Sequence, residues 1–386
     1  MLAKLSPALL TPEMIWPNRY NHDLDAITGA LWSIGPGGGR FFKANRRQLS
    51  VQEKLDLLVQ AGVTHIEAHD TDILGLVGLT GYPSDWSESH KMDVMQKAAV
   101  RFGHELDVRK LRCGMWTMNL FASEPEFNFA NFGSEIDGVR QLSIDRTCRG
   151  IDAAIDVLNA NVYVYWVGTN GVDGTLSAFH PKRLYRTREA LIEILDRSAT
   201  KHGAKMLPFA IEPKPEEPKD AMYLGTTGDA MTMILWIALT HPHLAKLLGV
   251  NIETAHPKMA KADPAMDIGY ALSLGKLFHV HENGQRNGPA FDQDEAAGDD
   301  DLRALVDRMW QLHTAGYKGL IGTDVQPLPC DRDHQQAESV TRSVRNIKWA
   351  VKKARELDPK IMAALQAQHN QSGIYEYINR VLFGIG

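Results

Sequence analysis

Residues 248–284, LGVNIETAHPKMAKADPAMDIGYALSLGKLFHVHENG, carry the clearest indication of the fold. Its two short apolar runs, 248–256 and 276–284, are typical of buried strands, and the segment 263–274 between them has the spacing of an amphipathic helix. A strand, a helix and a second strand in this order predict two parallel strands. Both runs end in acidic or imidazole side chains, so polar chemistry is expected at one end of the sheet.

The same alternation runs through the rest of the chain. Strands are predicted at 27–35, 63–70, 112–121, 162–168, 205–213, 248–256, 276–284 and 319–327. Helices are predicted from Ser50 to Gly62 and near 86–102, 144–160, 186–202, 227–240, 263–274, 300–316 and 336–357. Eight strand–helix units are the number that closes a (β/α)8 TIM barrel, which is the predicted fold. A doubly wound open sheet is the alternative, but polar residues ending seven different strands would not converge in it.

The domain organisation is predicted to be simple. We expect one barrel domain over residues 1–330 and a C-terminal helical extension over 331–386, because no low-complexity linker or internal repeat divides the chain. The N-terminal sequence lacks the apolar region of a signal peptide, and no apolar run approaches the length of a membrane span. A cytoplasmic protein without a membrane partner is therefore expected.

Composition excludes several classes of site. The formal net charge of −5 argues against a nucleic-acid partner, since such surfaces carry clustered excess Lys and Arg. The cysteines are few, odd in number and far apart, at Cys113, Cys148 and Cys330. They indicate neither a disulfide framework nor a thiolate zinc site.

Acidic residues and histidines recur where the later strands end and in the loop FDQD. The candidate metal ligands are Glu212, Glu253, His256, His281, Asp292, Asp294 and Asp324. Each acid alone could be a carboxylate paired with Lys or Arg, but together they would need several cations, and only Lys214 is obviously near in sequence. Oxygen-rich clusters with one or two imidazoles suit Mg²⁺, Mn²⁺ or Co²⁺. The pattern therefore predicts an enzyme that binds two divalent metal ions.

Three further motifs carry possible chemistry. In HVHEN, His279 and His281 share a strand face, so whichever reaches the strand end faces the site, while Glu282 should point towards a helix or solvent. In HDTD, Asp72 can fix the tautomer of His69 for proton transfer, or the four residues can form a hydrogen-bonded turn. Lys214 can donate to a developing oxyanion, or only pair with Glu212.

Aromatic residues also lie near the predicted strand ends. Core packing is the default interpretation for Trp32, Phe42, Phe121 and Trp166, but several at one mouth would form the dry walls on which sugars stack. The glycine-rich segment GPGGGR, residues 35–40, is interpreted as a flexible loop, because no GK[ST] follows and no helix opens there.

The ordered series HDTD, WTMNLF, FAIEPKPEEP, NIETAH, LFHVHENGQ, FDQD and GTDVQP resembles the D-xylose (glucose) isomerase family. The likeness runs from about residue 27 to residue 330. It implies a TIM barrel, two divalent metal ions per chain (Mg²⁺, Mn²⁺ or Co²⁺) and a homotetramer assembled through the helical tail. The implied reaction is conversion of D-xylose to D-xylulose, and of D-glucose to D-fructose, by a metal-assisted hydride shift.

The resemblance also implies a role for each matching residue. The first metal would be bound by Glu212, Glu253, His281 and Asp324, and the second by Glu253, His256, Asp292 and Asp294. His69, oriented by Asp72, would open the sugar ring, and Lys214 would stabilise the oxygen on the terminal carbon. Substrate contacts would come from Trp32, Phe42, Thr117, Phe121, Trp166 and Asn283, with Phe42 supplied to the neighbouring subunit.

This sequence departs from the family pattern at three positions. His281 stands where the family has a metal-binding aspartate, which should weaken Mg²⁺ relative to Mn²⁺ or Co²⁺. Thr71 replaces an acid, and Gln326 replaces a lysine. These changes leave open an isomerase of another sugar, or a non-catalytic sugar-binding homologue. A three-metal phosphodiesterase that cleaves DNA at abasic sites would need more histidine ligands and a basic face.

Overall fold

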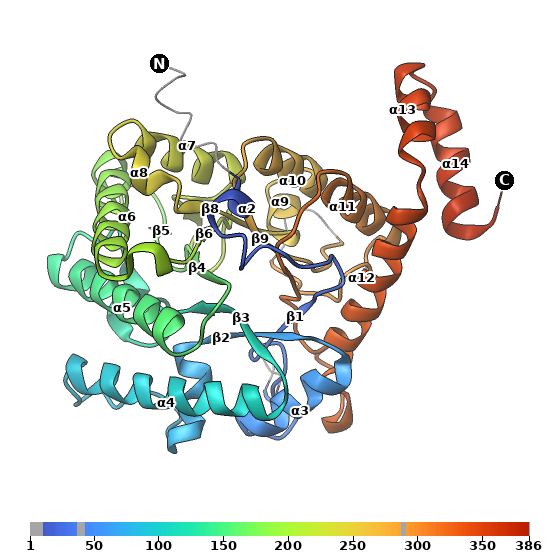
Figure 1. Ribbon diagram of the computed structural model, residues 1–386. Helices are drawn as coiled ribbons and strands as arrows, with labels where there is room; N and C mark the ends of the chain where they lie inside the picture. The colour runs from blue at the N-terminus through green and yellow to red at the C-terminus, as the bar shows by residue number, and fades with distance from the viewer. Residues whose placement is uncertain (1–10, 37–42, 287–290, 386) are drawn as a thin grey trace.

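A single parallel sheet forms the centre of the molecule. The computed structural model describes residues 11–36, 43–286 and 291–385. The sheet has eight strands in the order β1-β2-β3-β4-β6-β8-β9-β10. They are β1 (Thr28–Ala30), β2 (His65–His69), β3 (Arg112–Thr117), β4 (Val162–Trp166), β6 (Phe209–Glu212), β8 (Leu248–Glu253), β9 (Leu277–His281) and β10 (Ile321–Gly322). A parallel bridge between Ile27 and Ile321 joins the last strand to the first, so the predicted (β/α)8 barrel is confirmed (Figure 1).

Helices surround the barrel (Figure 1). The long ones are α3 (Val51–Ala61), α4 (Glu88–Val108), α5 (Asp137–Asp156), α6 (His180–His202), α7 (Thr227–Ala238), α10 (Pro264–Ser273), α11 (Leu302–Thr314) and α12 (Glu338–Glu356). Shorter elements lie in the connections: α2 (Pro12–Ile15), α8 (Pro242–Ala245), α9 (Ala255–Met259), and the 3₁₀ turns η2 (Asp70–Val77), η3 (Pro125–Phe129), η4 (Gly203–Lys205) and η5 (Asp333–Gln335). A small antiparallel pair, β5 (Gly171–Val172) and β7 (Ala221–Met222), was not predicted from the sequence.

Helix α3 shows how local sequence fixes an element. The Ser50 hydroxyl accepts a hydrogen bond from the Glu53 backbone N–H, and the Glu53 carboxylate accepts one from the Ser50 backbone N–H, which is the expected capping box. Gly62 ends the helix at φ +85°, a conformation that suits glycine. Leu55 and Leu58 are fully buried against the barrel, and each contributes roughly 2 kcal/mol of hydrophobic stabilisation.

The element boundaries differ most where the barrel closes. The strands predicted at 27–35 and 319–327 are reduced to the three residues of β1 and the two residues of β10, with the single bridge at Ile27 beside β1. Leu31 makes the last hydrogen bond of this ladder, from its backbone N–H to the Glu67 carbonyl, whereas Ile34 is buried but lies beyond the ladder. Burial, and not strand pairing, produced that part of the pattern.

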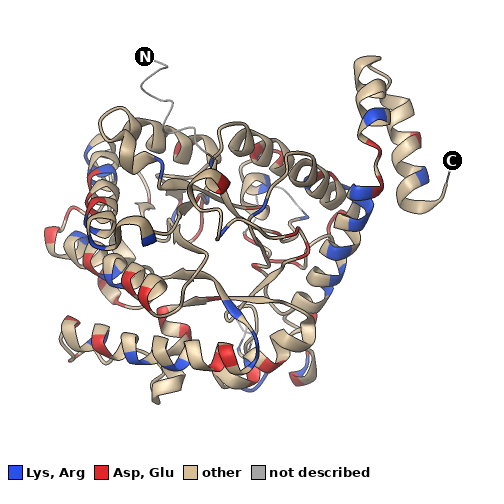
Figure 2. Ribbon diagram, in the orientation of Figure 1, with Lys and Arg blue, Asp and Glu red and all other residues tan. Residues whose placement is uncertain are grey.

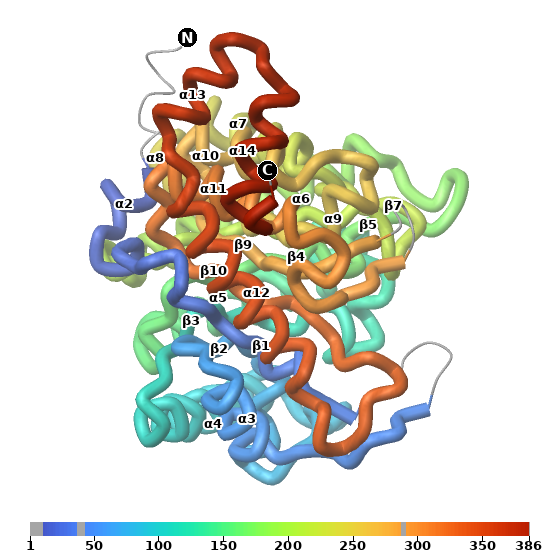
Figure 3. Tube along the Cα trace, turned by 90° about the vertical axis from the view of Figure 1, so that its right-hand side faces the viewer, coloured from blue at the N-terminus to red at the C-terminus, as the bar shows by residue number. Residues whose placement is uncertain are grey.

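The C-terminal region divides into two parts. Helix α12 packs against α11 and α3, and its residues Val340, Val344 and Ile347 are buried. Figure 3 shows α12 running along the barrel wall. Beyond it, α13 (Pro359–Ala367) and α14 (Gln371–Phe383) form a pair that stands off the ring (Figure 1). The domain boundary at residue 330 stays a prediction; the projecting arm itself is formed by α13 and α14.

Charge is distributed unevenly over the outer helices. Figure 2 shows Lys and Arg gathered along α12, whereas both signs of charge mix along α4, α5 and α6. Among the described residues, the helices are all too short or too polar to cross a bilayer.

Candidate metal centre

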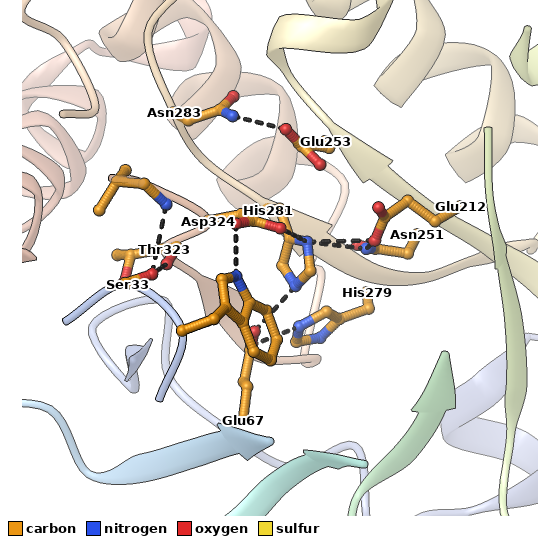
Figure 4. A network of polar contacts seen from close by, with 12 residues as sticks. Ser33, Glu67, Glu212, Asn251, Glu253, His279, His281, Asn283, Thr323 and Asp324 are labelled. Carbon is orange, nitrogen blue, oxygen red and sulfur yellow. Dashed lines mark hydrogen bonds and ion pairs between the residues drawn. The ribbon is translucent and has the colours of Figure 1, made fainter. Parts of the chain in front are cut away.

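Four predicted ligands meet at one end of the barrel. Glu212, Glu253 and His281 are the last residues of β6, β8 and β9, and Asp324 follows β10 by two residues. Parallel strands of a barrel all end at the same rim, so their terminal side chains converge. Each of these four residues offers a ligand atom within 4.8 Å of the others (Figure 4). We call them the first ligand group.

A second ligand group shares Glu253 with the first. It consists of Glu253, His256 and Asp292, with ligand atoms again within 4.8 Å of one another. His256 Nε2 lies 3.2 Å from Glu253 Oε2 and 3.0 Å from Asp292 Oδ2. Glu253 ends β8, His256 lies in the short helix α9, and Asp292 lies in the loop after β9. Asp294 lines the same cavity but joins neither group within the described part of the chain.

Lys214 is the cation that reaches this region. Its Nζ lies 2.9 Å from Asp292 Oδ2 and 3.6 Å from Glu217 Oε2, so the alternative of a simple pair with Glu212 is not what the structure contains. Burial acts to lower the pKa of Lys214, but the charges of Asp292 and Glu253 raise it above its usual range. The lysine therefore stays protonated and neutralises one carboxylate of the second group.

The remaining carboxylates crowd one another. Burial, followed by the charges of Asp292 and Asp324, raises the pKa of Glu253 well above its ordinary value. Burial and Asp292 do the same to the pKa of Asp294. Like charges buried together favour protonation unless a cation lies among them.

The residues present fit divalent cations. The donor set is carboxylate oxygen with two imidazoles, which suits Mg²⁺, Mn²⁺ or Co²⁺. Two atoms of the second group, His256 Nδ1 and Asp292 Oδ1, are buried without a hydrogen-bond partner among the described residues. Metal binding is thus supported by the composition and crowding of both groups; the number and identity of the ions belong to the proposal below.

A buried polar layer lies directly beneath the first group. Glu67 of β2 is fully buried; its Oε1 lies 2.8 Å from His279 Nε2 and its Oε2 lies 2.9 Å from His281 Nε2 (Figure 4). The other nitrogen of His281, Nδ1, is 3.2 Å from Glu212 Oε2 and 3.6 Å from Asp324 Oδ2. His281 is thus the histidine of HVHEN that reaches the rim.

Carboxylates on both sides control the protonation of His281. Burial acts to lower the pKa of His281, but Glu67 and Glu212 raise it well above its usual value. The raised pKa favours the ring with two protons when no cation is bound. A metal ion at Nδ1 would displace one of them, so metal binding should release protons.

Glu67 and Asn251 were not identified from the sequence. Asn251 Nδ2 donates to Glu212 Oε2 at 2.5 Å and lies 3.1 Å from His281 Nδ1. A signal was available, since Glu67 is a charged residue inside the apolar strand VTHIEAHD and a buried charge requires a partner. The partner itself could not be named, because the pairing joins residues more than 200 positions apart.

The cavity above the ligand groups has aromatic walls. It has a volume of about 160 Å³ and is lined by Trp32, His69, Thr117, Phe121 and Trp166 together with the acidic residues. The rings of Phe121 and Trp166 meet edge to face at 4.6 Å, and those of Trp32 and His69 lie 4.5 Å apart. Trp32 Nε1 also donates to Asp324 Oδ1 at 2.6 Å, so this aromatic side chain supports a predicted ligand.

His69 and Asp72 form a hydrogen-bonded pair. Asp72 Oδ2 lies 3.0 Å from His69 Nδ1 and also accepts the His69 backbone N–H at 2.8 Å. Burial acts to lower the pKa of His69, but the adjacent Asp72 raises it. The contact through Nδ1 leaves Nε2 as the ring nitrogen available to a ligand in the cavity. The pair also forms the start of the turn η2, so the hydrogen-bonded turn is present, while proton transfer by His69 stays a prediction.

The other predicted residues have mixed placements. Asn283 does not line the cavity; its Nδ2 donates to Glu253 Oε1 at 2.7 Å and so orients a predicted ligand. Glu282 points away from the site as expected and forms a buried ion pair with Arg308 of α11 at 2.8 Å. Phe42 lies outside the described residues, and its predicted role stays a prediction.

Sequence comparison identifies the family. Residues 55–347 match the model of the family described as xylose isomerase-like TIM barrel. The chain belongs to this family. The resemblance to D-xylose isomerase is therefore confirmed at the level of the broader family, and the specific enzyme is a matter for proposal.

Solved structures share the fold at low sequence identity. A D-tagatose 3-epimerase-like protein superposes with a TM-score of 0.60 at 14% identity, covering 86% of this chain and 98% of its own. An L-ribulose 3-epimerase gives 0.57 at 14% identity, with 89% and 99% covered. A xylose isomerase domain protein from Alicyclobacillus acidocaldarius gives 0.53 at 16% identity, with 86% and 100% covered. At these identities the likeness shows the fold alone.

Proposed function

We propose that this protein is a metal-dependent aldose–ketose isomerase that acts on a small unphosphorylated sugar, with D-xylose as the first candidate and D-xylulose as its product. D-Glucose, giving D-fructose, is the second candidate. The observation that carries this proposal is the presence of two ligand groups that share Glu253 and open into one cavity with Lys214 and the His69–Asp72 pair. The reaction moves the hydrogen on C2 to C1 and the hydroxyl proton from O2 to O1, so substrate and product have the same formula.

Two divalent ions are proposed at these groups. Glu212, Glu253, His281 and Asp324 would bind one, and Glu253, His256, Asp292 and Asp294 the other. Bound there, such ions polarise sugar oxygens and lower the pKa of a coordinated water. Asp294 could complete the second group by a small movement, since it already faces the same cavity.

His69 is proposed to act on the cyclic sugar before isomerisation. Asp72 occupies Nδ1, so Nε2 is free to exchange a proton with the ring oxygen or the anomeric hydroxyl. Opening the ring releases the carbonyl carbon that the isomerisation requires. The Trp32 and Phe121 rings, with centres 4.5 Å and 5.5 Å from that of His69, restrict its orientation.

Lys214 and the aromatic walls are proposed to position the open chain. Lys214 Nζ can donate to the oxygen on the terminal carbon while it keeps its contact with Asp292. Its Nζ also lies 5.6 Å from the centre of the Trp166 ring, which helps to fix the side chain. Apolar walls exclude water and strengthen each polar contact made inside the cavity.

The charges of the cavity favour a neutral substrate. Lys214 is the one lysine or arginine among the described residues that line it, and Asp292 already pairs with this side chain. A sugar phosphate would therefore meet a surplus of carboxylates and no free basic group. The volume of about 160 Å³ suits a monosaccharide and not a larger glycan.

A sugar 3-epimerase is the second candidate. The specific observation in its favour is that Glu212 and Glu253 approach the cavity from neighbouring strands β6 and β8, so one ion at the first group and two carboxylates could serve proton transfer on a single carbon. The solved structures of similar fold reported above include a D-tagatose 3-epimerase-like protein and an L-ribulose 3-epimerase. This candidate gives no role to His256 and Asp292.

The deciding experiment separates the two reactions. Metal-free protein is reconstituted with Mg²⁺, Mn²⁺ or Co²⁺ and incubated with D-xylose, D-glucose and a panel of ketoses, and products are identified by ¹³C NMR. We expect about two ions per chain and an aldose–ketose equilibrium that EDTA abolishes. Formation of C3-epimeric ketoses without any aldose would replace the isomerase by the epimerase. No product with any pairing of metal and sugar would refute both.

The arm formed by α13 and α14 is proposed to hold subunits together in a homotetramer. Its exposed apolar residues include Ile361, Tyr375 and Phe383, which would be buried in such an assembly. Light scattering on the full chain tests this directly, and a monomer at micromolar concentration would contradict it.

A further inference from the structure

Glu67 is a fully buried charge to which the proposed reaction gives no role. Its Oε1 accepts a hydrogen bond from the Thr28 hydroxyl and contacts His279. Its Oε2 lies 2.9 Å from His281 Nε2, and neither of these two atoms has any other hydrogen-bond partner among the described residues. The contact between these two atoms is therefore an ion-pair contact without the geometry of a hydrogen bond.

The opposite side of the ring fixes which nitrogen faces the ligand group. The Glu212 carboxylate can only accept, so the Asn251 side chain must present its NH₂ group to it. The same NH₂ group lies 3.1 Å from His281 Nδ1, and this nitrogen also lies 3.2 Å from Glu212 Oε2 and 3.6 Å from Asp324 Oδ2. A metal ion can bind Nδ1 only through its lone pair, so in the metal-binding form the ring hydrogen is on Nε2, towards Glu67.

Gly322 of β10 provides the space for this pair. A Cβ at position 322 would lie 2.4 Å from Glu67 Oε1 and 2.6 Å from His281 Cδ2. Real side chains do not approach so closely, so any other residue would displace the carboxylate or the ring. The backbone of the neighbouring strand is thus shaped to admit both groups.

We propose that Glu67 is the positioning residue of His281. It orients the ring so that Nδ1 faces Glu212 and Asp324. Its carboxylate also supplies a negative charge near the cation, which a histidine ligand does not supply and an aspartate ligand would. A metal-bound imidazole that donates its other N–H to a carboxylate is better oriented and more basic as a ligand. The inference rests on the proposed role of His281 as a metal ligand.

The first test measures metal affinity directly. Full-length metal-free protein carrying Glu67→Gln, which preserves side-chain size, is titrated with Mn²⁺ by calorimetry. We expect affinity for the tighter ion to fall about 10- to 100-fold, with the number of sites still near two. His279→Gln is the matched control, because it removes the imidazole that contacts Glu67 Oε1 and leaves the contact of Oε2 with His281. It should leave affinity within about threefold even where it lowers the melting temperature.

A double-mutant cycle distinguishes positioning from a structural role. In a His281→Asp background, Glu67 faces a like charge, so Glu67→Gln should leave Mn²⁺ affinity unchanged or improve it. An equal loss in both backgrounds would overturn the proposal. Loss of one whole ion in both Glu67→Gln and His279→Gln would also overturn it, because Glu67 would then be a ligand of its own site.

A spectroscopic measurement needs no variant at either position. Protein labelled with ¹⁵N-histidine and loaded with a diamagnetic ion should show one ring with protonated Nε2 and metal-bound Nδ1; the opposite assignment for His281 overturns the proposal.

Sugar conversion is assayed in parallel, so that failure of the isomerase proposal can be distinguished from failure of the role of Glu67. If the protein binds ions and Glu67→Gln weakens them but no sugar is converted, only the isomerase proposal fails; if sugar is converted and Glu67→Gln binds normally, only the role of Glu67 fails.

Discussion

A buried basic side chain lies at each end of strand β9, and the surroundings of the two side chains are opposite in character. At the C-terminal end, His281 lies within 3.6 Å of carboxylate oxygens from Glu67, Glu212 and Asp324. Just before the N-terminal end, Lys276 is 2% exposed, and its hydrogen bonds within the described ranges go to backbone carbonyl oxygens, of Ala245 at 2.7 Å and Leu248 at 3.0 Å. Burial lowers the pKa of Lys276 to about 7.

The difference shows when a buried charge indicates a site. Lys276 is a single charge that carbonyl dipoles accommodate and that loses its proton readily. The rim instead gathers several acids around a cavity, and the repulsion that Lys214 leaves unbalanced is relieved by protonation of a carboxylate or by a bound cation. Several acidic side chains crowded next to a cavity, and not burial alone, indicate the functional end of the barrel.

The largest expected effect is at the residue shared by both ligand groups. Glu253→Gln should lower turnover by more than about a thousandfold, about 4 kcal/mol, because it weakens both proposed ions. The same change should raise the melting temperature of the EDTA-treated protein, since the burial and the charges of Asp292 and Asp324 that raise the pKa of Glu253 make its ionised form unfavourable. Steady-state kinetics and thermal unfolding check both parts. Glu126→Gln, at an exposed position, is the control. Normal turnover in the Glu253→Gln variant would contradict the assignment of the acidic rim as the functional end of the barrel.

The second effect concerns the other end of β9. Folded Lys276 has a pKa near 7 and the unfolded residue one near 10.4, so between these values the unfolded chain binds more protons. The free energy of unfolding should therefore rise with pH from about 7 to 10, by a few kcal/mol from this residue. Lys276→Met should be more stable than the wild type at pH 7, with the advantage shrinking towards pH 10. Denaturant unfolding at three pH values tests this, and parallel pH profiles for the two proteins would show that Lys276 does not titrate as expected.

Metal should stabilise the rim without affecting Lys276. At a free Mn²⁺ concentration 100 times the dissociation constant, the folded state gains about 2.7 kcal/mol from each site. The melting temperature should fall on EDTA treatment by the same amount in the wild type and in Lys276→Met. A gain that depended on Lys276 would mean that the two ends are coupled.

The smallest effect is expected from a residue that only supports a ligand. Trp32→Phe keeps an aromatic wall but removes the hydrogen bond from Nε1 to Asp324 Oδ1. Metal affinity should fall by about tenfold, or about 1.4 kcal/mol, within the usual range for such supporting groups. Calorimetry with Mn²⁺ measures it. Unchanged affinity would show that Trp32 does not help to orient Asp324, and would leave Glu67, Asn251 and Asn283 as the residues that orient ligands at the rim.

Much of the fold could be predicted because each strand–helix unit has its own local signal. The capping box at Ser50 and the apolar runs of β6 and β8 are examples. The boundaries failed where burial continues past hydrogen bonding, as after β1. In the candidate site, the convergence of Glu212, Glu253, His281 and Asp324 followed from their common position at strand ends. Asp294 shows the limit of that argument, because its place in a loop gave no geometry.

A barrel of alternating strands and helices, with acids and histidines at one rim, follows from the amino-acid sequence because periodicity and position along a strand are local properties. Which charges meet depends on the three-dimensional fold. Trp32 contacts Asp324 across 292 positions, Glu67 lies under His281, and Lys214 pairs with Asp292 instead of Glu212. These pairings depend on barrel closure and on side-chain packing at distances of about 3 Å, which no local pattern encodes.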